Sequence, residues 1–252
     1  MMKGGNEPHR ASGLSDSGSQ NRVMDVSFAD RAIHLPESDT LVLADLHLGR
    51  GTSADVELPL PDGDLPPRIA ALCDRFSPAT VVLAGDVLHA FSHVPTAARE
   101  AFREVEAVVK DAGARLVVTP GNHDAMLDGI WDGPTPTAFP AGETTVLHGH
   151  EPPEREAERY VVGHDHPKIT IEGDDWPCYL LGEDVYRGAD VLVLPAFTRL
   201  ASGVAVNGGH GRGPLERSPL ITDIDRFRPV VRDEDADETL EFPPLGAFRE
   251  LL

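Results

Sequence analysis

The stretch TLVLADLHLGR, from Thr40 to Arg50, is a short apolar run that ends in a carboxylate and an imidazole. The same design recurs in ATVVLAGDV at residues 79–87 and in RLVVTPGNHD at residues 115–124. Short Val- and Leu-rich runs bounded by Gly, Pro and polar residues are typical of buried β-strands. Three successive strands are therefore expected to carry polar side chains to one site at the points where they end.

Helical patterns separate these strands. Residues 66–76 begin with Pro and place Ile69, Leu72 and Phe76 on one side, and a second helix is expected near residues 96–112. From residue 143 the pattern is mostly strands, in TTVLHGH, RYVVGHDH, KITIEG, PCYLL, DVLVLPAF and SGVAVN, and residues 23–34 predict two further short strands. This order predicts one α/β domain with two packed sheets and helices outside them.

The expected domain spans residues 22–252 and follows a disordered Gly- and Ser-rich tail at residues 1–21. Residues 207–218 are expected to form a flexible loop, and the acidic run at 233–238 a solvated connection before a short C-terminal segment. An apolar signal core and a membrane-length apolar run are both absent. We therefore expect a cytoplasmic protein with no membrane contact, in which Cys73 and Cys178 are reduced thiols.

The net charge is −20, from 42 acidic and 22 basic residues, and the only lysines are Lys3, Lys110 and Lys168. Nucleic-acid-binding proteins usually carry a basic footprint, so this balance argues against a polyanionic partner. Acid-rich, lysine-poor surfaces also resemble those of proteins from cells that accumulate multimolar salt, where charges are screened within about 3 Å. A halophilic origin is therefore our hypothesis for the charge, and in that setting net charge says little about the ligand.

Carboxylates, a carboxamide and imidazoles occur at or near strand ends, and we predict that they hold two divalent metal ions. Because side chains alternate along a strand, Asp45 and His47 are expected to point the same way, as are His164 and His166. Mixed oxygen and imidazole ligands suit Mn²⁺, which we expect, or Fe, Zn²⁺, Co²⁺ or Ni²⁺. Two ions about 3.5–4 Å apart can activate a bridging water and clamp a phosphoryl group for in-line attack. The predicted ligands are Asp45, His47, Asp86, Asn122, His148, His164 and His166.

His123 follows a predicted ligand but has no forced place among the ligands. It could stabilise developing charge or protonate the leaving oxygen, with Asp124 orienting its ring. Arg50 and Arg199 could contact a substrate phosphate. Three further histidines lie near the same loops, but ordinary polar loop residues explain them better: His89, His93 and His210.

With these motifs the chain resembles the calcineurin-like metallophosphoesterase superfamily, whose pattern is DxH, GD, GNH(D/E), a His-Gly element and GHxH. The resemblance implies a four-layer α/β/β/α sandwich with a dinuclear site between the sheets. It takes His148 rather than His150 as the ligand from His-Gly-His, an assignment that the residues themselves leave open. It implies Asp45, His47, Asp86 and His166 for one ion, and Asp86, Asn122, His148 and His164 for the other. It leaves His123 as the catalytic histidine.

A narrower resemblance links ADLHLGR, GDVLHAF, GHDHP and LPAFTRLASGVAVN to archaeal predicted phosphoesterases and bacterial ligase-associated metallophosphoesterases. That branch implies a phosphodiester substrate, DNA or RNA included, and an association with DNA repair; the protein partners themselves are unknown. Asp165 adds a negative charge in the variable position of GHxH. The alternatives are a phosphomonoesterase or a cyclic-nucleotide or dinucleotide hydrolase. A non-catalytic scaffold is disfavoured because each motif residue is present.

Overall fold

The computed structural model describes residues 25–50, 64–89, 93–208 and 217–249. The expected tail at residues 1–21 and most of the expected loop at residues 207–218 lie outside these ranges. The helices are α1 (Leu65–Phe76), α2 (Thr96–Asp111) and α3 (Leu245–Arg249), with short 3₁₀ turns at Pro36–Ser38, Leu127–Gly129 and Ile224–Arg226. The strands are β1 (Ser27–Ala29), β2 (Ala32–Leu35), β3 (Thr40–Leu43), β4 (Thr80–Leu83), β5 (Arg115–Val118), β6 (Phe139–Ala141), β7 (Thr144–Leu147), β8 (Arg159–Val162), β9 (Pro167–Ile171), β10 (Asp174–Pro177), β11 (Tyr179–Tyr186), β12 (Ala189–Val193), β13 (Val204–Ala205), β14 (Arg228–Asp233) and β15 (Glu238–Glu241).

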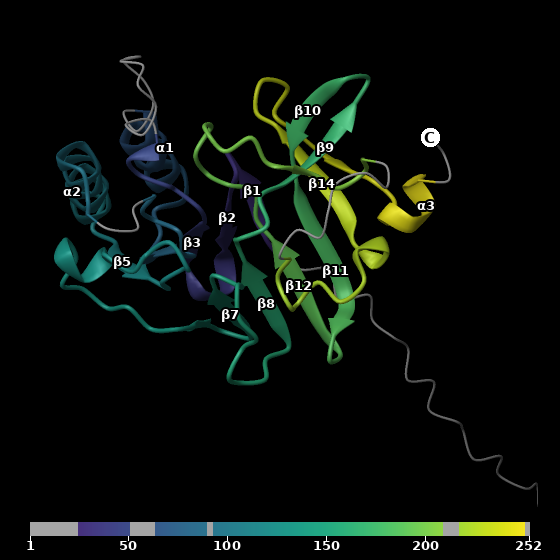
Figure 1. The fold of residues 1–252 in the computed structure, drawn as a ribbon, viewed down its shortest axis with the longest axis horizontal. Helices are drawn as coiled ribbons and strands as arrows, with labels where there is room; N and C mark the ends of the chain where they lie inside the picture. The colour runs from purple at the N-terminus through teal and green to yellow at the C-terminus, as the bar shows by residue number, and fades with distance from the viewer. Residues whose placement is uncertain (1–24, 51–63, 90–92, 209–216, 250–252) are drawn as a thin grey trace, which may run out of the picture.

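Two mixed sheets form the centre of the molecule (Figure 1). The first has the order β1-β2-β3-β4-β5, with β1 to β3 antiparallel and β3 to β5 parallel. The second has the order β15-β14-β11-β12-β8-β7-β6, in which β7, β8 and β12 run parallel to one another. Both sheets therefore contain parallel neighbours whose carboxyl ends lie side by side, as a strand-end site requires.

The sheets pack face to face over a shared apolar layer. Side chains alternate across β3, so that Leu41 and Leu43 pack toward the helices, whereas Val42 packs between the sheets. This alternation explains why all four residues of β3 are buried although the strand is short. The Tyr179 hydroxyl donates to the carbonyl of Ala32 at 2.8 Å and ties the second sheet to the first.

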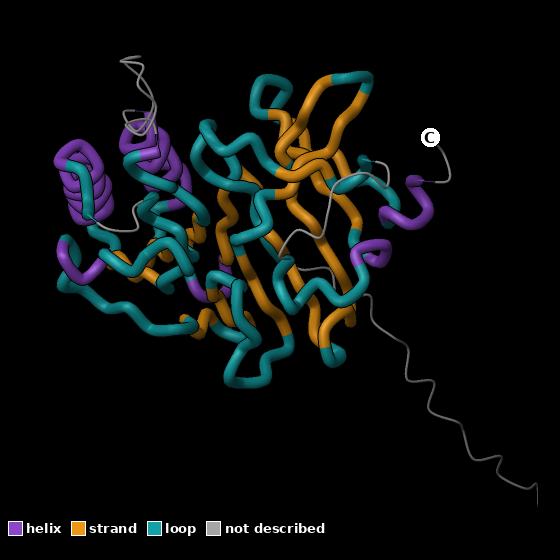
Figure 2. Tube along the Cα trace, viewed as in Figure 1, coloured by secondary structure: helices purple, strands orange, loops and turns teal. Residues whose placement is uncertain are grey.

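Helices α1 and α2 cover the outer face of the first sheet, as the sequence predicts (Figure 2). The outer face of the second sheet is covered by α3 and by a three-stranded sheet of order β10-β9-β13. The layered α/β sandwich is confirmed, and its second outer layer contains only one short helix among the described residues. None of the described helices is long and apolar enough to cross a bilayer.

The C-terminal part contains structure that the sequence did not indicate. The acidic run begins at the last residue of β14 and ends at the first of β15, so the expected solvated connection is the turn of a hairpin. All four residues of β15 are exposed, which explains the missing apolar signal. Cys73 and Cys178 are free and buried, in agreement with the expectation of reduced thiols.

Candidate metal centre

The loops that follow β3 and β4 run side by side beyond the ends of the strands. The Asp45 amide donates to the carbonyl of Gly85 at 3.0 Å, and the His47 amide donates to the carbonyl of Asp86 at 2.9 Å. On the second sheet, the Gly163 amide donates to the carbonyl of His148 at 3.0 Å. Backbone hydrogen bonds thus hold the predicted ligands of each sheet next to one another.

The prediction that strand alternation aligns the ligand pairs was wrong in its reasoning. Asp45 and His47 lie beyond the end of β3, and both have left-handed backbone conformations, with φ of 57° and 47°. His164 and His166 lie beyond β8, with φ of 72° and 45°, and Asp86 has φ of 47°. Left-handed conformations are uncommon outside glycine and often mark functional sites. Five of the seven predicted ligands are therefore positioned by left-handed turns.

One cluster of ligand atoms consists of Asp45, His47 and His166. The Nε2 atoms of the two imidazoles are 3.1 Å apart, and His166 Nε2 is 3.3 Å from Asp45 Oδ1. Burial lowers the pKa of His47 to about 3, so its ring is neutral at physiological pH, as a metal ligand must be. Burial also lowers the pKa of His166, but the Asp45 carboxylate outweighs it and the net pKa is raised. The carboxylate thus attracts positive charge to this point.

A second cluster forms around His148, which is buried between the sheets. Its Nδ1 lies 3.1 Å from the carbonyl of Ala84 and can only donate there, which leaves Nε2 with a lone pair. Nε2 is 3.2 Å from Asn122 Oδ1 and 3.4 Å from Asp86 Oδ1. Although Asp45 Oδ1 is 3.7 Å from the ring, it faces the Nδ1 atom that donates to the carbonyl. The geometry therefore favours Asp86 and Asn122 as the partners of His148.

The remaining histidines of the GHxH and His-Gly-His motifs, His164 and His150, lie at different distances from the second cluster. The His164 ring is 5.1 Å from the ring of His148, and burial, followed by the charge of His148, lowers its pKa. The His164 amide donates to Asp45 Oδ2 at 3.0 Å. His150 lies farther out, with its ring 6.2 Å from His164, which favours His148 over His150 as the ligand.

Two glycines allow these side chains to approach each other. A Cβ on Gly85 would overlap the His148 ring, and Gly85 itself has φ of 74°. A Cβ on Gly121 would overlap the Asp86 carboxylate and would lie 2.9 Å from the His148 ring. The glycines of GD and GNH are therefore required for the close approach of backbone and ligands.

His123 lies against the Asp86 carboxylate. Its amide donates to Asp86 Oδ1 at 3.0 Å, and its ring Nε2 is 3.8 Å from Asp86 Oδ2. Asp124 differs from the prediction that it orients the His123 ring, because its two oxygens accept the amides of Leu88 and Gly121, each at 2.9 Å. Asp124 is thus a buried residue that positions the loop.

The sequence interpretation missed His89. Its ring stacks on His123 with 5.6 Å between ring centroids and 15° between planes, and it contacts His47 edge-on at 5.6 Å. Burial, followed by the charges of Arg50 and His123, lowers its pKa. The signal that could have found His89 is its position three residues after Asp86. The loop after β4 continues beside the loop after β3, and the His89 amide donates to the carbonyl of Leu48 at 2.9 Å.

The donor set fits divalent metal ions. The paired Nε2 atoms of His47 and His166 face each other beside the buried Asp45 carboxylate, an arrangement that needs a shared cation or proton. Buried charges in proteins are normally paired or coordinate metals. The fixed ring of His148 faces two oxygens of the same region. The two clusters therefore provide for a dinuclear divalent metal site.

Comparisons with known proteins identify the family of the chain. A family model described as calcineurin-like phosphoesterase matches residues 39–189, which contain every predicted ligand. A search of curated proteins found no match. The crystal structure of the nuclease MPE from Pseudomonas putida is similar with a TM-score of 0.56 and 21% identity, over 84% of this chain and 92% of that one. The phosphoesterase YfcE from E. coli gives a TM-score of 0.41 and 12% identity, over 81% of this chain and 98% of that one. The chain belongs to the calcineurin-like phosphoesterase family and is a metal-dependent phosphoester hydrolase.

Proposed function

We propose that the protein is a dinuclear metal-dependent phosphodiesterase that acts on nucleic acid, with Mn²⁺ as its metal and His123 as its catalytic histidine. The observation that carries the proposal is the convergence of the two ligand clusters, which brings residues from both sheets to one point. The fold likeness to the nuclease MPE makes nucleic acid the first substrate to test.

The distances between side chains support an assignment of the predicted ligands to two ions. Asp45, His47 and His166 would hold one ion, and Asn122 and His148, with His164 beside them, would hold the other. Asp86, which is grouped with Asp45 and His148, would supply a ligand to both ions. When bound, two such ions lower the pKa of a water molecule and stabilise charge on a phosphoryl group.

His123 has a different role in the proposal, because its ring does not lie in either cluster. Asp86 fixes its backbone, and its side chain is 22% exposed, so one side of the ring faces solvent. From that position the imidazole can donate a proton to the leaving oxygen of a phosphodiester. General acid catalysis of this kind contributes a factor of roughly 10²–10⁴ in rate.

The deciding experiment measures hydrolysis of bis-p-nitrophenyl phosphate in concentrated KCl with added Mn²⁺. Wild type, Asp86→Asn, His123→Ala and chelator-treated protein are compared. We expect metal-dependent turnover that is lost in Asp86→Asn and reduced roughly 10²–10⁴-fold in His123→Ala. A His123→Ala rate equal to that of wild type would contradict the mechanism. Hydrolysis of the monoester p-nitrophenyl phosphate alone would replace the diesterase by a phosphatase.

The acidic surface belongs to the same proposal. We infer that the excess of 20 negative charges is an adaptation to high salt, in a cytoplasmic protein associated with DNA repair. Salt screens the repulsion among these charges. Thermal unfolding in increasing KCl should therefore show a rising Tm, and full stability in dilute buffer would contradict the adaptation.

A further inference from the structure

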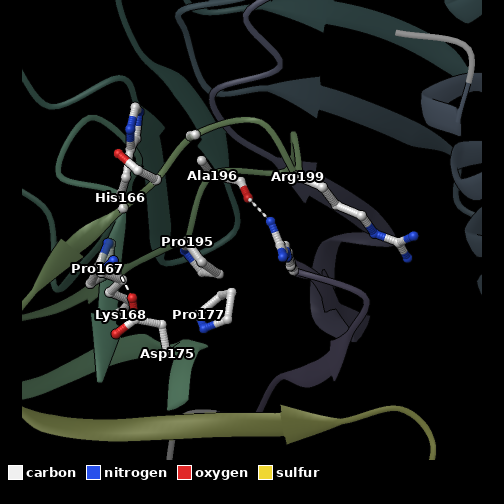
Figure 3. Close-up of a pocket in the computed structure, with 12 residues that line it drawn as sticks. His166, Pro167, Lys168, Asp175, Pro177, Pro195, Ala196 and Arg199 are labelled. Carbon is white, nitrogen blue, oxygen red and sulfur yellow. Dashed lines mark hydrogen bonds and ion pairs between the residues drawn. The ribbon is translucent and has the colours of Figure 1, made fainter. Parts of the chain in front are cut away.

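Two adjoining cavities open beside the metal centre. The first, of about 200 Å³, is lined by His166 together with Lys168, Arg31 and Arg199 (Figure 3). The second, of about 260 Å³, shares Arg31 and Arg199 with the first and extends to Trp176. Because the cavities have lining residues in common, they form one path that leads from a predicted metal ligand to an exposed indole.

The first cavity concentrates positive charge in a strongly acidic protein. Lys168 is one of three lysines in the chain, and its Nζ pairs with Asp175 at 2.6 Å (Figure 3). Arg199 is 61% exposed and pairs with Asp64 at 3.6 Å. Asp175 is half exposed and Asp64 one-third exposed, and ion pairs at such positions contribute little stability. An incoming phosphate can therefore replace either carboxylate at small cost.

Arg31 is held in this cavity by its backbone and by two carbonyls. It lies in the two-residue turn between β1 and β2 with φ of 64°, where Gly or Asn is the usual choice. Its Nη1 donates to the carbonyls of Ala196 at 3.3 Å and Thr198 at 2.9 Å. Burial, followed by the neighbouring charges of Arg68 and Arg199, lowers the pKa of Arg31 to about 10. These positive charges lie close enough to repel one another, and an anion would relieve that repulsion.

The second cavity has a different character. Four acidic residues line it, at positions 30 and 233–235, and they outnumber its three arginines, which are Arg31, Arg199 and Arg232. It is therefore less favourable to a phosphate than the first cavity. Trp176 is 37% exposed, and among the described residues the only other large apolar side chain with comparable exposure is Leu240. An exposed indole at the edge of a cavity suits a flat, uncharged ring, and a nucleic-acid base is such a ring.

We propose that the two cavities bind a second nucleotide of a single-stranded nucleic acid, with its phosphate beside Arg31, Lys168 and Arg199 and its base stacked on Trp176. The proposal rests on the phosphodiesterase function and names the substrate class. Stacking on a side chain requires an unpaired base, so the site selects single strands over duplexes. The charge balance sets the direction, because basic side chains outnumber acidic ones in the first cavity and acidic side chains outnumber basic ones in the second.

The protein variants Lys168→Gln and Trp176→Ala test the two halves of the subsite. Their controls are Arg103→Gln, an exposed arginine on α2, and Leu240→Ala. For each we compare kcat/KM on a labelled single-stranded oligonucleotide with kcat/KM on bis-p-nitrophenyl phosphate, which has no second nucleotide. The ratio should fall roughly tenfold in Trp176→Ala and roughly threefold to tenfold in Lys168→Gln. Trp176→Phe should recover most of the ratio, and both controls should keep it.

Modified substrates separate a direct contact from a structural effect. In a series of oligonucleotides, a single abasic nucleotide is placed at each position in turn. Wild type should cleave one member of the series more slowly, because the base that stacks on Trp176 is missing from it. Trp176→Ala should cleave that member no more slowly than the unmodified oligonucleotide. In a second series, an uncharged methylphosphonate replaces each phosphate in turn. One replacement should slow cleavage by wild type and should cause no further loss of rate in Lys168→Gln. Binding measured on cleavage-inactive Asp86→Asn should lose about 0.7 from the slope of log Kd against log[KCl] when Lys168→Gln is added.

Freeing the lysine should have the opposite effect. Asp175→Asn removes the carboxylate that pairs with Lys168 and should tighten oligonucleotide binding by up to about fivefold. A duplex, a DNA strand and an RNA strand complete the panel, and we expect weak binding of the duplex. Equal preference for duplex and single strand would contradict stacking on Trp176.

The outcomes distinguish the subsite from the function on which it rests. Wild-type hydrolysis of bis-p-nitrophenyl phosphate, together with unchanged ratios in every variant, would overturn the subsite and leave the phosphodiesterase intact. Absence of diester hydrolysis would overturn the proposed function. Even without diester hydrolysis, quenching of tryptophan fluorescence by an oligonucleotide, measured in wild type and in Trp176→Phe, tests the cavity. If the oligonucleotide does not quench Trp176, the subsite is wrong whatever the outcome for the function. Thermal unfolding of each variant confirms that it is folded.

Discussion

Asp124→Asn distinguishes a loop-positioning residue from a partner of the catalytic histidine. The Asp124 carboxylate is buried, and each oxygen accepts one backbone amide, from Leu88 and from Gly121, at 2.9 Å. The bond from Leu88 joins the loop after β4 to the loop after β5, and the bond from Gly121 closes a turn within the loop after β5. An asparagine has the same shape but only one oxygen, so one of the two amides must face an NH₂ group.

The expected loss follows from those two contacts. A hydrogen bond to a charged group contributes about 1.5–3 kcal/mol, and a buried donor without a partner costs about 1–3 kcal/mol. Burial raises the pKa of Asp124, which shows that the ionised carboxylate carries a desolvation cost that the neutral amide avoids. We therefore expect a net destabilisation of about 2–3 kcal/mol, which lowers the Tm of a domain this size by about 4–12 °C.

Thermal unfolding by circular dichroism, in concentrated KCl with a chelator, measures this loss. Asp128→Asn is the matched control, because Asp128 is exposed in the same loop and undergoes the same change in charge. The pH dependence of bis-p-nitrophenyl phosphate hydrolysis is recorded for both variants below their Tm. An unchanged Tm in Asp124→Asn, together with a shifted pH profile, would refute the positioning role and restore the prediction that Asp124 orients His123.

Three further changes test the metal centre and the packing of the fold. Gly121→Ala places a Cβ against Asp86 and should weaken Mn²⁺ binding roughly 10- to 100-fold by calorimetry; Gly129→Ala, where the Cβ meets open space, is the control. Arg68→Met removes donors that contact the Asp30 carboxylate at 2.7 and 3.0 Å, and it should lower the free energy of unfolding by about 2–3 kcal/mol. Denaturant unfolding should show a lower midpoint with an unchanged m-value. Chelation should remove about 2.7 kcal/mol of stability relative to Mn²⁺ at 100 times its Kd, and a Tm that ignores Mn²⁺ would contradict a resident metal.

The parts of the fold that the sequence predicts are those with a strong apolar signal. The runs that form β3, β4 and β5 are almost wholly buried, and α1 and α2 each have one buried face. The strands that it missed or left without clear bounds lack that signal, since β10 and β15 consist mainly of exposed residues. They are stabilised by pairing with β9 and β14, and the apolar pattern of the exposed strands themselves does not contain that information.

The sequence also predicted the residue types of the candidate metal site, because hard oxygens and imidazoles at strand ends are chemically specific. It could not give their arrangement. Motif spacing was explained by the two-residue period of a strand, whereas the structure positions Asp45, His47 and Asp86 after the strands have ended. The position of Asp124 was missed for a similar reason, because its amide partner Leu88 is defined only when two loops meet.

The left-handed turns show what holds the ligands in place. A non-glycine residue in such a conformation costs about 1–3 kcal/mol and persists only when its surroundings impose it. At Asp45 and His47 the surroundings are backbone hydrogen bonds to the neighbouring loop, and at His164 the amide donates to the Asp45 carboxylate. These bonds involve no metal, so the ligand positions are set by the chain itself. Removing the ion should therefore lower the stability of the protein without unfolding the site. The conformational free energy of the left-handed turns is what it costs to arrange the predicted ligands before a metal binds.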